Sequence, residues 1–129
     1  MTHHKHIIIR AEINSPPKDI RYIKKWVRKL VKAIGMRPLG KPTAVYSNKE
    51  GNRGLTCVQC IDTSHIALHV WDETSPAIAQ LDVYTCGELD KEIVLLFLDD
   101  FEPTKVSHTI IDRAEFIDVK TNKIERVKL

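Results

Sequence analysis

Apolar and polar residues alternate over several short stretches of the chain, which is the pattern of β-strands that pack on one face. Stretches of this kind, most of them rich in β-branched residues, predict strands at 6–13, 42–48, 55–71, 77–87 and 105–116. In the third of these, residues 55–61 run almost directly into "SHIALHVW" (64–71), so we count the two as one strand. The last segment, 117–129, alternates around a Thr-Asn pair and predicts an edge hairpin.

The stretch between the first two strands has the spacing of a helix. Its apolar residues recur every three or four positions, at Ile20, Ile23, Val27, Leu30, Val31 and Ile34. We expect Asn14 or Ser15 to cap this helix and Pro16–Pro17 to occupy its first turn. Asp19 suits the positive end of the helix dipole, and Gly35 is expected to end the helix.

A second helix is predicted over 92–101, where the apolar run is almost continuous and should be heavily buried. Asp90 can cap this helix, and Pro103 is expected to terminate it. The order β-α-β-β-β-α-β predicts an α+β fold, a two-layer α/β sandwich with a mostly antiparallel sheet and two helices packed on one face. A length of 129 residues without a repeat or linker indicates one domain spanning 1–129.

Composition limits where the protein works and what it binds. A hydrophobic content of 43% and a charged content of 29% are typical of a globular protein. No apolar run approaches the ~20 residues of a membrane helix, so no membrane partner is expected.

Three cysteines are an odd number, which favours a reducing cytoplasm over a disulfide framework. Cys57 and Cys60 have the spacing of a redox or zinc pair, but no second ligand pair is nearby. We interpret them as small buried strand residues, interpret "HHKH" (3–6) as a solvated strand entry, and expect no metal.

The net charge of +3 is mild, but basic residues gather in the first helix. They are Lys18, Arg21, Lys24, Lys25, Arg28, Lys29 and Lys32. Acidic residues elsewhere in the chain balance this charge, so we interpret the group as the solvent face of an amphipathic helix and expect no nucleic-acid partner.

Reactive side chains lie in predicted strands where a packed core would carry Val or Ile. Alternation along 64–71 puts Ser64 on one face and, on the other, His65, Ala67, His69 and Trp71. In the neighbouring strand one face would carry Gln80, Asp82, Tyr84 and Cys86. Because the helices cover only one side of the sheet, we expect these polar groups to form a site on the open side.

The motif "SHIALH", followed by Trp71, Glu73 and "LDVYTCG", resembles the Ser-His-x-x-x-His, Trp-x-Glu and Thr-Cys-Gly motifs of the small bacterial and archaeal S-adenosylmethionine decarboxylases. The similarity extends over most of the chain, from "HIIIRAEI" to "KVSHTIIDR". It implies a cytoplasmic decarboxylase that supplies decarboxylated S-adenosylmethionine for polyamine synthesis. It also implies a homodimer with its sites at the interface.

This family makes a pyruvoyl cofactor from its own chain, so the resemblance implies self-cleavage between Thr63 and Ser64. Ser64 would attack the Thr63 carbonyl, and the resulting ester would eliminate to leave a pyruvoyl group that serves as an electron sink. His69 matches the histidine that moves the α-proton, a task that suits an imidazole. Thr56 falls where the family has a serine that assists processing, and Cys86 matches the cysteine that protonates the product carbon.

The resemblance also assigns a substrate-binding end, where Trp71 would stack on adenine, Glu73 would bind ribose hydroxyls, and Tyr46 is a further stacking candidate. An ideal strand places Ser64 and His69 on opposite faces, so we expect a bend or bulge near Ser64. Two alternatives stay open. One is an uncut, non-catalytic homologue that binds a nucleoside-like ligand or a partner. The other is a pyruvoyl-dependent decarboxylase of another amino acid, such as arginine or ornithine.

Overall fold

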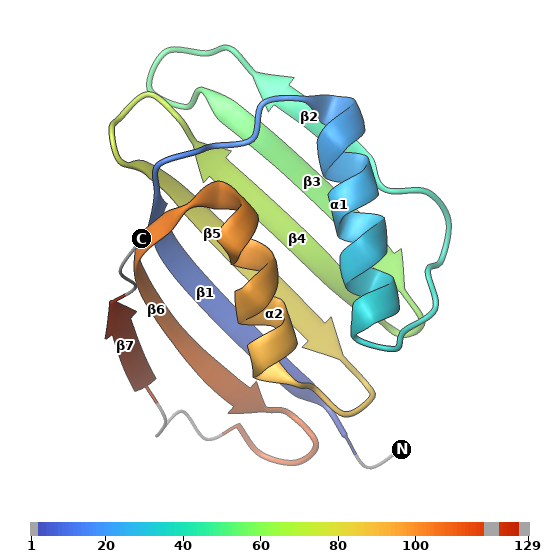
Figure 1. Ribbon diagram of the computed structural model, residues 1–129. Coiled ribbons are helices and arrows are strands. Elements are labelled where there is room, and N and C mark those ends of the chain that lie inside the picture. Colours follow the sequence, from blue (N-terminus) through green and yellow to red (C-terminus); the bar gives the residue numbers. More distant parts are fainter. Residues whose placement is uncertain (1–2, 118–121, 127–129) are drawn as a thin grey trace.

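The computed structural model describes residues 3–117 and 122–126, which form one sheet and two helices (Figure 1). The elements are β1 (Lys5–Ile13), α1 (Ile20–Ala33), β2 (Thr43–Ser47), β3 (Gly54–Ile61), β4 (Ser64–Trp71), β5 (Ala77–Thr85), α2 (Lys91–Phe97), a 3-10 helix (Leu98–Phe101), β6 (Pro103–Asp112) and β7 (Asn122–Arg126).

Within these residues the sheet has seven strands in the order β2-β3-β4-β5-β1-β6-β7, and each neighbouring pair is antiparallel. The N-terminal strand therefore lies inside the sheet, between β5 and β6. Both helices lie over the same sheet face (Figure 1), and the Trp26 indole joins them by donating to the Phe97 carbonyl of α2 at 3.2 Å. The predicted α+β sandwich is confirmed.

The prediction of one strand over 55–71 was wrong, because the chain reverses at Asp62 and Thr63 to form the β3–β4 hairpin. Ile61 pairs with Ser64 across this turn, and the register continues without a bulge to Thr56 opposite His69. Thr63 makes the reversal with a φ of 55°. A β-branched residue disfavours that conformation, so the sequence carried no signal for a turn at this position.

The first helix begins later than predicted. Asp19 is its N-cap, and α1 starts at Ile20. The proposed caps, Asn14 and Ser15, instead donate their backbone N–H groups to carbonyls at the end of the 3-10 helix, each at 3.0 Å. The two consecutive prolines explain the delay, because a residue that precedes a proline disfavours the helical conformation.

The other predicted boundaries are met in part. Gly35 follows the end of α1 with a φ of 72°, as expected. Asp90 caps α2, but the α-helix is short and its last turn is a 3-10 helix. Pro103, predicted only as a terminator, is the first residue of β6. β7 supplies the predicted edge strand by pairing with β6, and the first half of the expected hairpin falls at 118–121, outside the described residues.

The core lies between the sheet and the helices. Its fully buried side chains include Ile7, Ile9, Leu30, Leu55, Leu68, Leu81 and Phe101. The burial of alternate strand positions leaves the second sheet face open, and on β4 this face carries the half-buried side chains of His65, His69 and Trp71, as predicted.

Candidate active site

Ser64 and Cys86 lie together at the β3–β4 turn. Ser64 begins β4, and Cys86 follows the last residue of β5, beyond the strand in which it was predicted to lie. The Cys86 backbone N–H donates to Ser64 Oγ at 2.9 Å, and its thiol donates to the Asp62 carbonyl at 3.3 Å. A fixed N–H directed at a hydroxyl oxygen stabilises the negative charge that develops as the serine loses its proton.

The residue before Ser64 is strained. Thr63 has a φ of 55°, in the left-handed region that side chains branched at Cβ rarely adopt. Its hydroxyl donates to the Asp62 carbonyl at 2.9 Å, which helps to hold the turn. The peptide bond predicted to be cut therefore follows a strained residue.

Thr56 and His69 form a second pair on the open face. They are direct cross-strand partners in the hairpin, and the hydroxyl of Thr56 lies 3.0 Å from His69 Nδ1. The Trp71 ring lies beside this imidazole, with ring centroids 6.3 Å apart. The structure thus brings the two residues predicted to assist processing into contact with each other.

The two pairs are far apart within one chain. Ser64 and His69 are five residues apart on a regular strand, which corresponds to about 16 Å. Their side chains also lie on opposite faces, because the strand alternates without interruption between them. Of the bend or bulge predicted near Ser64, the chain has a bend, at the turn before Ser64, and no bulge in the β3–β4 register; the turn does not bring the serine to the histidine.

The loop before β3 is held in place by hydrogen bonds to Glu73. Its carboxylate accepts hydrogen bonds from the backbone N–H groups of Arg53 at 2.9 Å and Gly51 at 3.1 Å, and the Arg53 guanidinium lies 3.4 Å away. These bonds, the one from Arg53 first, hold the pKa of Glu73 below its ordinary value of 4.5. The acid predicted to bind ribose thus already organises the loop beside it.

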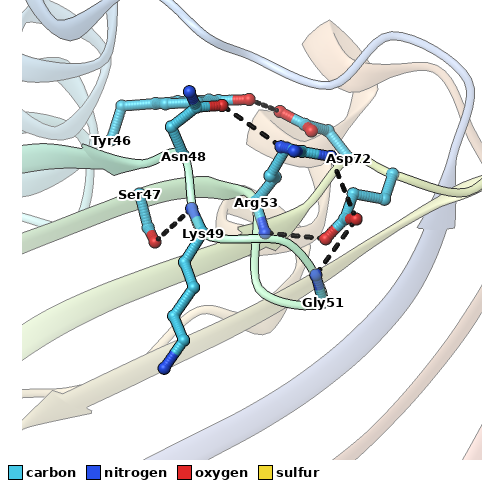
Figure 2. Close-up of polar contacts among 8 residues, drawn as sticks. Tyr46, Ser47, Asn48, Lys49, Gly51, Arg53 and Asp72 are labelled. Atoms are coloured by element: carbon cyan, nitrogen blue, oxygen red, sulfur yellow. Dashed lines mark hydrogen bonds and ion pairs between the residues drawn. The ribbon is translucent and has the colours of Figure 1, made fainter.

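Tyr46 and Trp71 also have partners at this end of the sheet. The Tyr46 hydroxyl donates to Asp72 at 2.7 Å (Figure 2), and this bond raises the pKa of the phenol above 10.0. The Trp71 indole donates to the Asn52 side chain at 3.3 Å. The three residues predicted to bind the nucleoside are therefore ordered by contacts with the same two loops.

The sequence predicted that His65 and Tyr84 share the open face, but it did not reveal the cluster of His4, His6 and Arg113 around Tyr84. The Tyr84 hydroxyl lies 3.1 Å from His4 Nδ1, and the rings of His6 and His65 lie 5.5 Å and 5.8 Å from its ring. The Arg113 guanidinium covers the Tyr84 ring at 4.3 Å from its centroid. "HHKH" was the available signal, but we interpreted it as solvated, whereas His6 is largely buried and pairs with Asp82 at 3.1 Å.

An open cavity of about 540 Å³ connects this cluster with Ser64. Its lining includes Thr63, Ser64, His65, Tyr84 and Arg113. Burial first, and then the nearby charge of His6, lower the pKa of His65 below its ordinary value of 6.5. The imidazole next to Ser64 is therefore neutral at pH 7.

The cysteine pair was interpreted half correctly. Cys57 is buried, and this burial raises the pKa of its thiol to about 11. Cys60 is exposed, because two strand residues three positions apart lie on opposite faces.

Among residues 3–117 and 122–126, no group of three or more His, Cys, Asp or Glu side chains could hold a metal ion. None of the described helices is long and apolar enough to span a membrane.

The fold and the site define a small α+β protein with reactive side chains at one end of an open sheet and aromatic and acidic side chains at the other. The chain belongs to the S-adenosylmethionine decarboxylase family, whose model matches residues 6–114. This match confirms the family inferred from the Ser64, Trp71–Glu73 and Cys86 motifs, together with the decarboxylase class of enzyme that the family represents.

Individual relatives agree with this assignment. An S-adenosylmethionine decarboxylase proenzyme from Methanococcus vannielii is 29% identical over 103 residues, covering 80% of this chain and 75% of the relative. One from Methanococcus maripaludis is 35% identical over 86 residues, covering 65% of this chain and 66% of the relative. The crystal structure of the adenosylmethionine decarboxylase from Aquifex aeolicus superposes with a TM-score of 0.71 at 20% identity, covering 95% of this chain and 98% of the other. At that identity the likeness concerns the fold.

Proposed function

We propose that this chain is a pyruvoyl-dependent S-adenosylmethionine decarboxylase that cuts itself before Ser64 and supplies decarboxylated S-adenosylmethionine for the synthesis of polyamines such as spermidine. The family assignment and the proenzyme names of its relatives support this proposal. The observation that carries it is the contact at the turn, where Ser64 Oγ receives the Cys86 N–H at 2.9 Å directly after a strained Thr63.

Self-cleavage uses the residues of this turn and an imidazole. Ser64 Oγ attacks the Thr63 carbonyl carbon, the peptide C–N bond breaks, and an ester replaces the amide. His69, oriented by Thr56, takes the Ser64 α-proton, and the Thr63 carboxylate leaves with its electron pair. Water then replaces the nitrogen of residue 64, which leaves as ammonia, and a pyruvoyl group remains at the new chain start.

The residues around Ser64 suit such a group. Its carbonyl supplies the electron sink that amino-acid decarboxylation needs and that no side chain provides. The Cys86 N–H can donate to an oxygen at this position, and its thiol lies at the same turn, where it can deliver a proton to the product carbon. Because His65 is neutral, it adds no positive charge to that of Arg113 in the cavity beside Ser64.

The distance between the two pairs supports a homodimer. About 16 Å of strand separates Ser64 from His69, so neither can act on the other within one chain. Two open faces packed with their β4 strands antiparallel would place the His69 of each chain near the β3–β4 turn of the other, which carries Ser64. Val58, Ala67, Asp82 and Ile8 lie side by side in one cross-strand row at the middle of this face. Ile8 and Val58, 40% and 37% exposed, supply apolar surface for that contact.

In the same arrangement, each substrate molecule would be bound by residues of both chains. The nucleoside would lie against Tyr46, Trp71 and Glu73 of one chain, and the amino-acid end would reach Ser64 of the other. A cytoplasmic location belongs to the proposal, because the three cysteines are free thiols, as expected in a reducing compartment.

Mass spectrometry under denaturing conditions tests the proposal. The purified chain of 14.8 kDa should appear as two fragments of about half that mass, the second beginning at a modified residue 64. Ser64→Ala should stay whole. The cut protein should release CO2 from S-adenosylmethionine. CO2 released only from arginine or ornithine would indicate the other decarboxylase, and an uncut, inactive chain would indicate the binding homologue.

A further inference from the structure

Arg113 is placed in the Ser64 cavity by contacts that the proposed reaction does not explain. It follows the end of β6, and its backbone N–H donates to the His4 carbonyl at 2.7 Å. Its guanidinium stacks on the Tyr84 ring at 4.3 Å from the centroid. Backbone and side chain are therefore both held, although the residue is exposed to solvent.

The charge of Arg113 has no partner among the ion pairs of the described residues. Stacking on an aromatic face uses the guanidinium plane and leaves its edge N–H groups free to donate. The edge of a guanidinium matches the two oxygens of a carboxylate. Arg113 thus presents the chemistry of a carboxylate site to the cavity.

We propose that Arg113 recognises the α-carboxylate of the substrate in the cavity beside Ser64. This inference rests on the proposed function, and it names the residue that selects the group which the reaction removes. Any amino-acid substrate that reacts at residue 64 carries its α-carboxylate within a few bonds of that position. Of the described residues lining the cavity, Arg113 is the one with a permanent positive charge.

An arginine in this role contributes to binding and not to the rate of decarboxylation. The negative charge leaves the carboxylate as CO2 forms, so the pairing is stronger in the bound substrate than in the transition state. Removing it should therefore raise KM without lowering kcat. A residue that merely supports the fold would lower the fraction of cut, active protein instead.

Arg113→Gln removes the charge and keeps a polar side chain of similar length. We expect KM for S-adenosylmethionine to rise about tenfold, the size of one partly exposed charged contact, with kcat equal or higher. Arg113→Lys, which keeps the charge and loses the fork, should show a smaller rise. Arg21→Gln, on the exposed face of α1, is the matched control and should leave both constants unchanged.

The decarboxylated product separates the carboxylate from the rest of the substrate. Calorimetric titration of the uncut Ser64→Ala chain should show S-adenosylmethionine binding about tenfold more weakly when Arg113→Gln is added, while product binding stays the same. An equal loss for both ligands, or no loss for either, would overturn the inference. If the unaltered chain releases no CO2, the proposed function fails and the inference with it; CO2 release with an unchanged KM in Arg113→Gln overturns the inference alone.

Discussion

The Thr56 hydroxyl lies 3.0 Å from His69 Nδ1, and this pair is about 16 Å along β4 from Ser64. Ser64 has its own close partner, Cys86, at the opposite end of the strand. Each pair is complete as a hydrogen bond, yet neither contains both Ser64 and an imidazole. A processing site therefore needs both pairs, and within one chain the strand keeps them apart.

Mixing two inactive variants tests whether the pairs meet between chains. His69→Ala should cut itself at least a hundredfold more slowly than the unaltered chain because it lacks the base, and Ser64→Ala should not cut at all. When the two are refolded together, about half of the His69→Ala chains should be cut, the share that random pairing puts in mixed dimers. Mass spectrometry identifies which chain gives the fragments.

The matched control replaces Ser64→Ala by the double variant Ser64→Ala/His69→Ala, which offers no imidazole to a neighbour. No cutting should appear in that mixture. Efficient cutting of His69→Ala by itself would show that processing does not need this imidazole. If the first mixture stays uncut, His69 of one chain does not act on Ser64 of the other.

Thr63 stores strain next to the bond proposed to be cut, and glycine would relieve it. In the uncut Ser64→Ala chain, Thr63→Gly should raise the free energy of unfolding by about 1 kcal/mol, because a left-handed φ of 55° costs a branched side chain more than glycine. In a chain that keeps Ser64, Thr63→Gly should slow cleavage, because less strain is released when the bond between residues 63 and 64 breaks. Urea unfolding measures the first effect and a mass-spectrometric time course the second.

Thr63→Asn is the intermediate case, because asparagine tolerates the left-handed region better than threonine does. Its stability and cleavage rate should fall between those of the other two chains. A destabilised or faster-cutting Thr63→Gly chain would show that the threonine side chain contributes something other than strain.

The three cysteines should react with iodoacetamide in an order set by burial. Burial under α1 raises the pKa of Cys57 to about 11, in spite of the nearby Lys24 and Arg28, so at pH 8 only about one thiol in a thousand is ionised. Cys60 and Cys86 are more accessible and should be labelled first. Peptide mass mapping gives the order, and in denaturant all three should react alike. Labelling of Cys57 at the rate of Cys60 in the folded chain would contradict the packing of α1 on β3.

The sequence predicted the layers well because alternation reports directly which strand face is buried. It missed the reversal at Thr63, since a threonine carries no preference for a left-handed turn. It also placed the first helix cap at Asn14 or Ser15, because the competing backbone bonds come from the 3-10 helix, distant in sequence. Local patterns do not contain such long-range contacts.

The candidate site, too, could be predicted only in part. The motifs around Ser64, His69 and Cys86 follow from family resemblance, but the side on which each one lies depends on the hairpin. The place of His4 in the Tyr84 cluster could not be predicted, because the two residues are 80 positions apart in the sequence. The position of Arg113 in the cavity could not be predicted either, because it depends on the fold that places the guanidinium over the Tyr84 ring.

His65 should make the stability of the uncut chain depend on pH. Burial first, then the charge of His6, with a smaller effect of Arg113, lower its pKa in the folded chain below 6.5, while Asp82 opposes them. The unfolded chain therefore takes up this proton first, so the contribution is complete above about pH 6.5 and is lost as the pH falls below it. In the Ser64→Ala background, His65→Asn should flatten the fall in unfolding free energy between about pH 7 and about pH 5, measured by urea titration. Equal slopes in the two chains would mean that His65 is as easily protonated when folded as when unfolded, and a positive charge would then compete with Arg113 at the cavity beside Ser64.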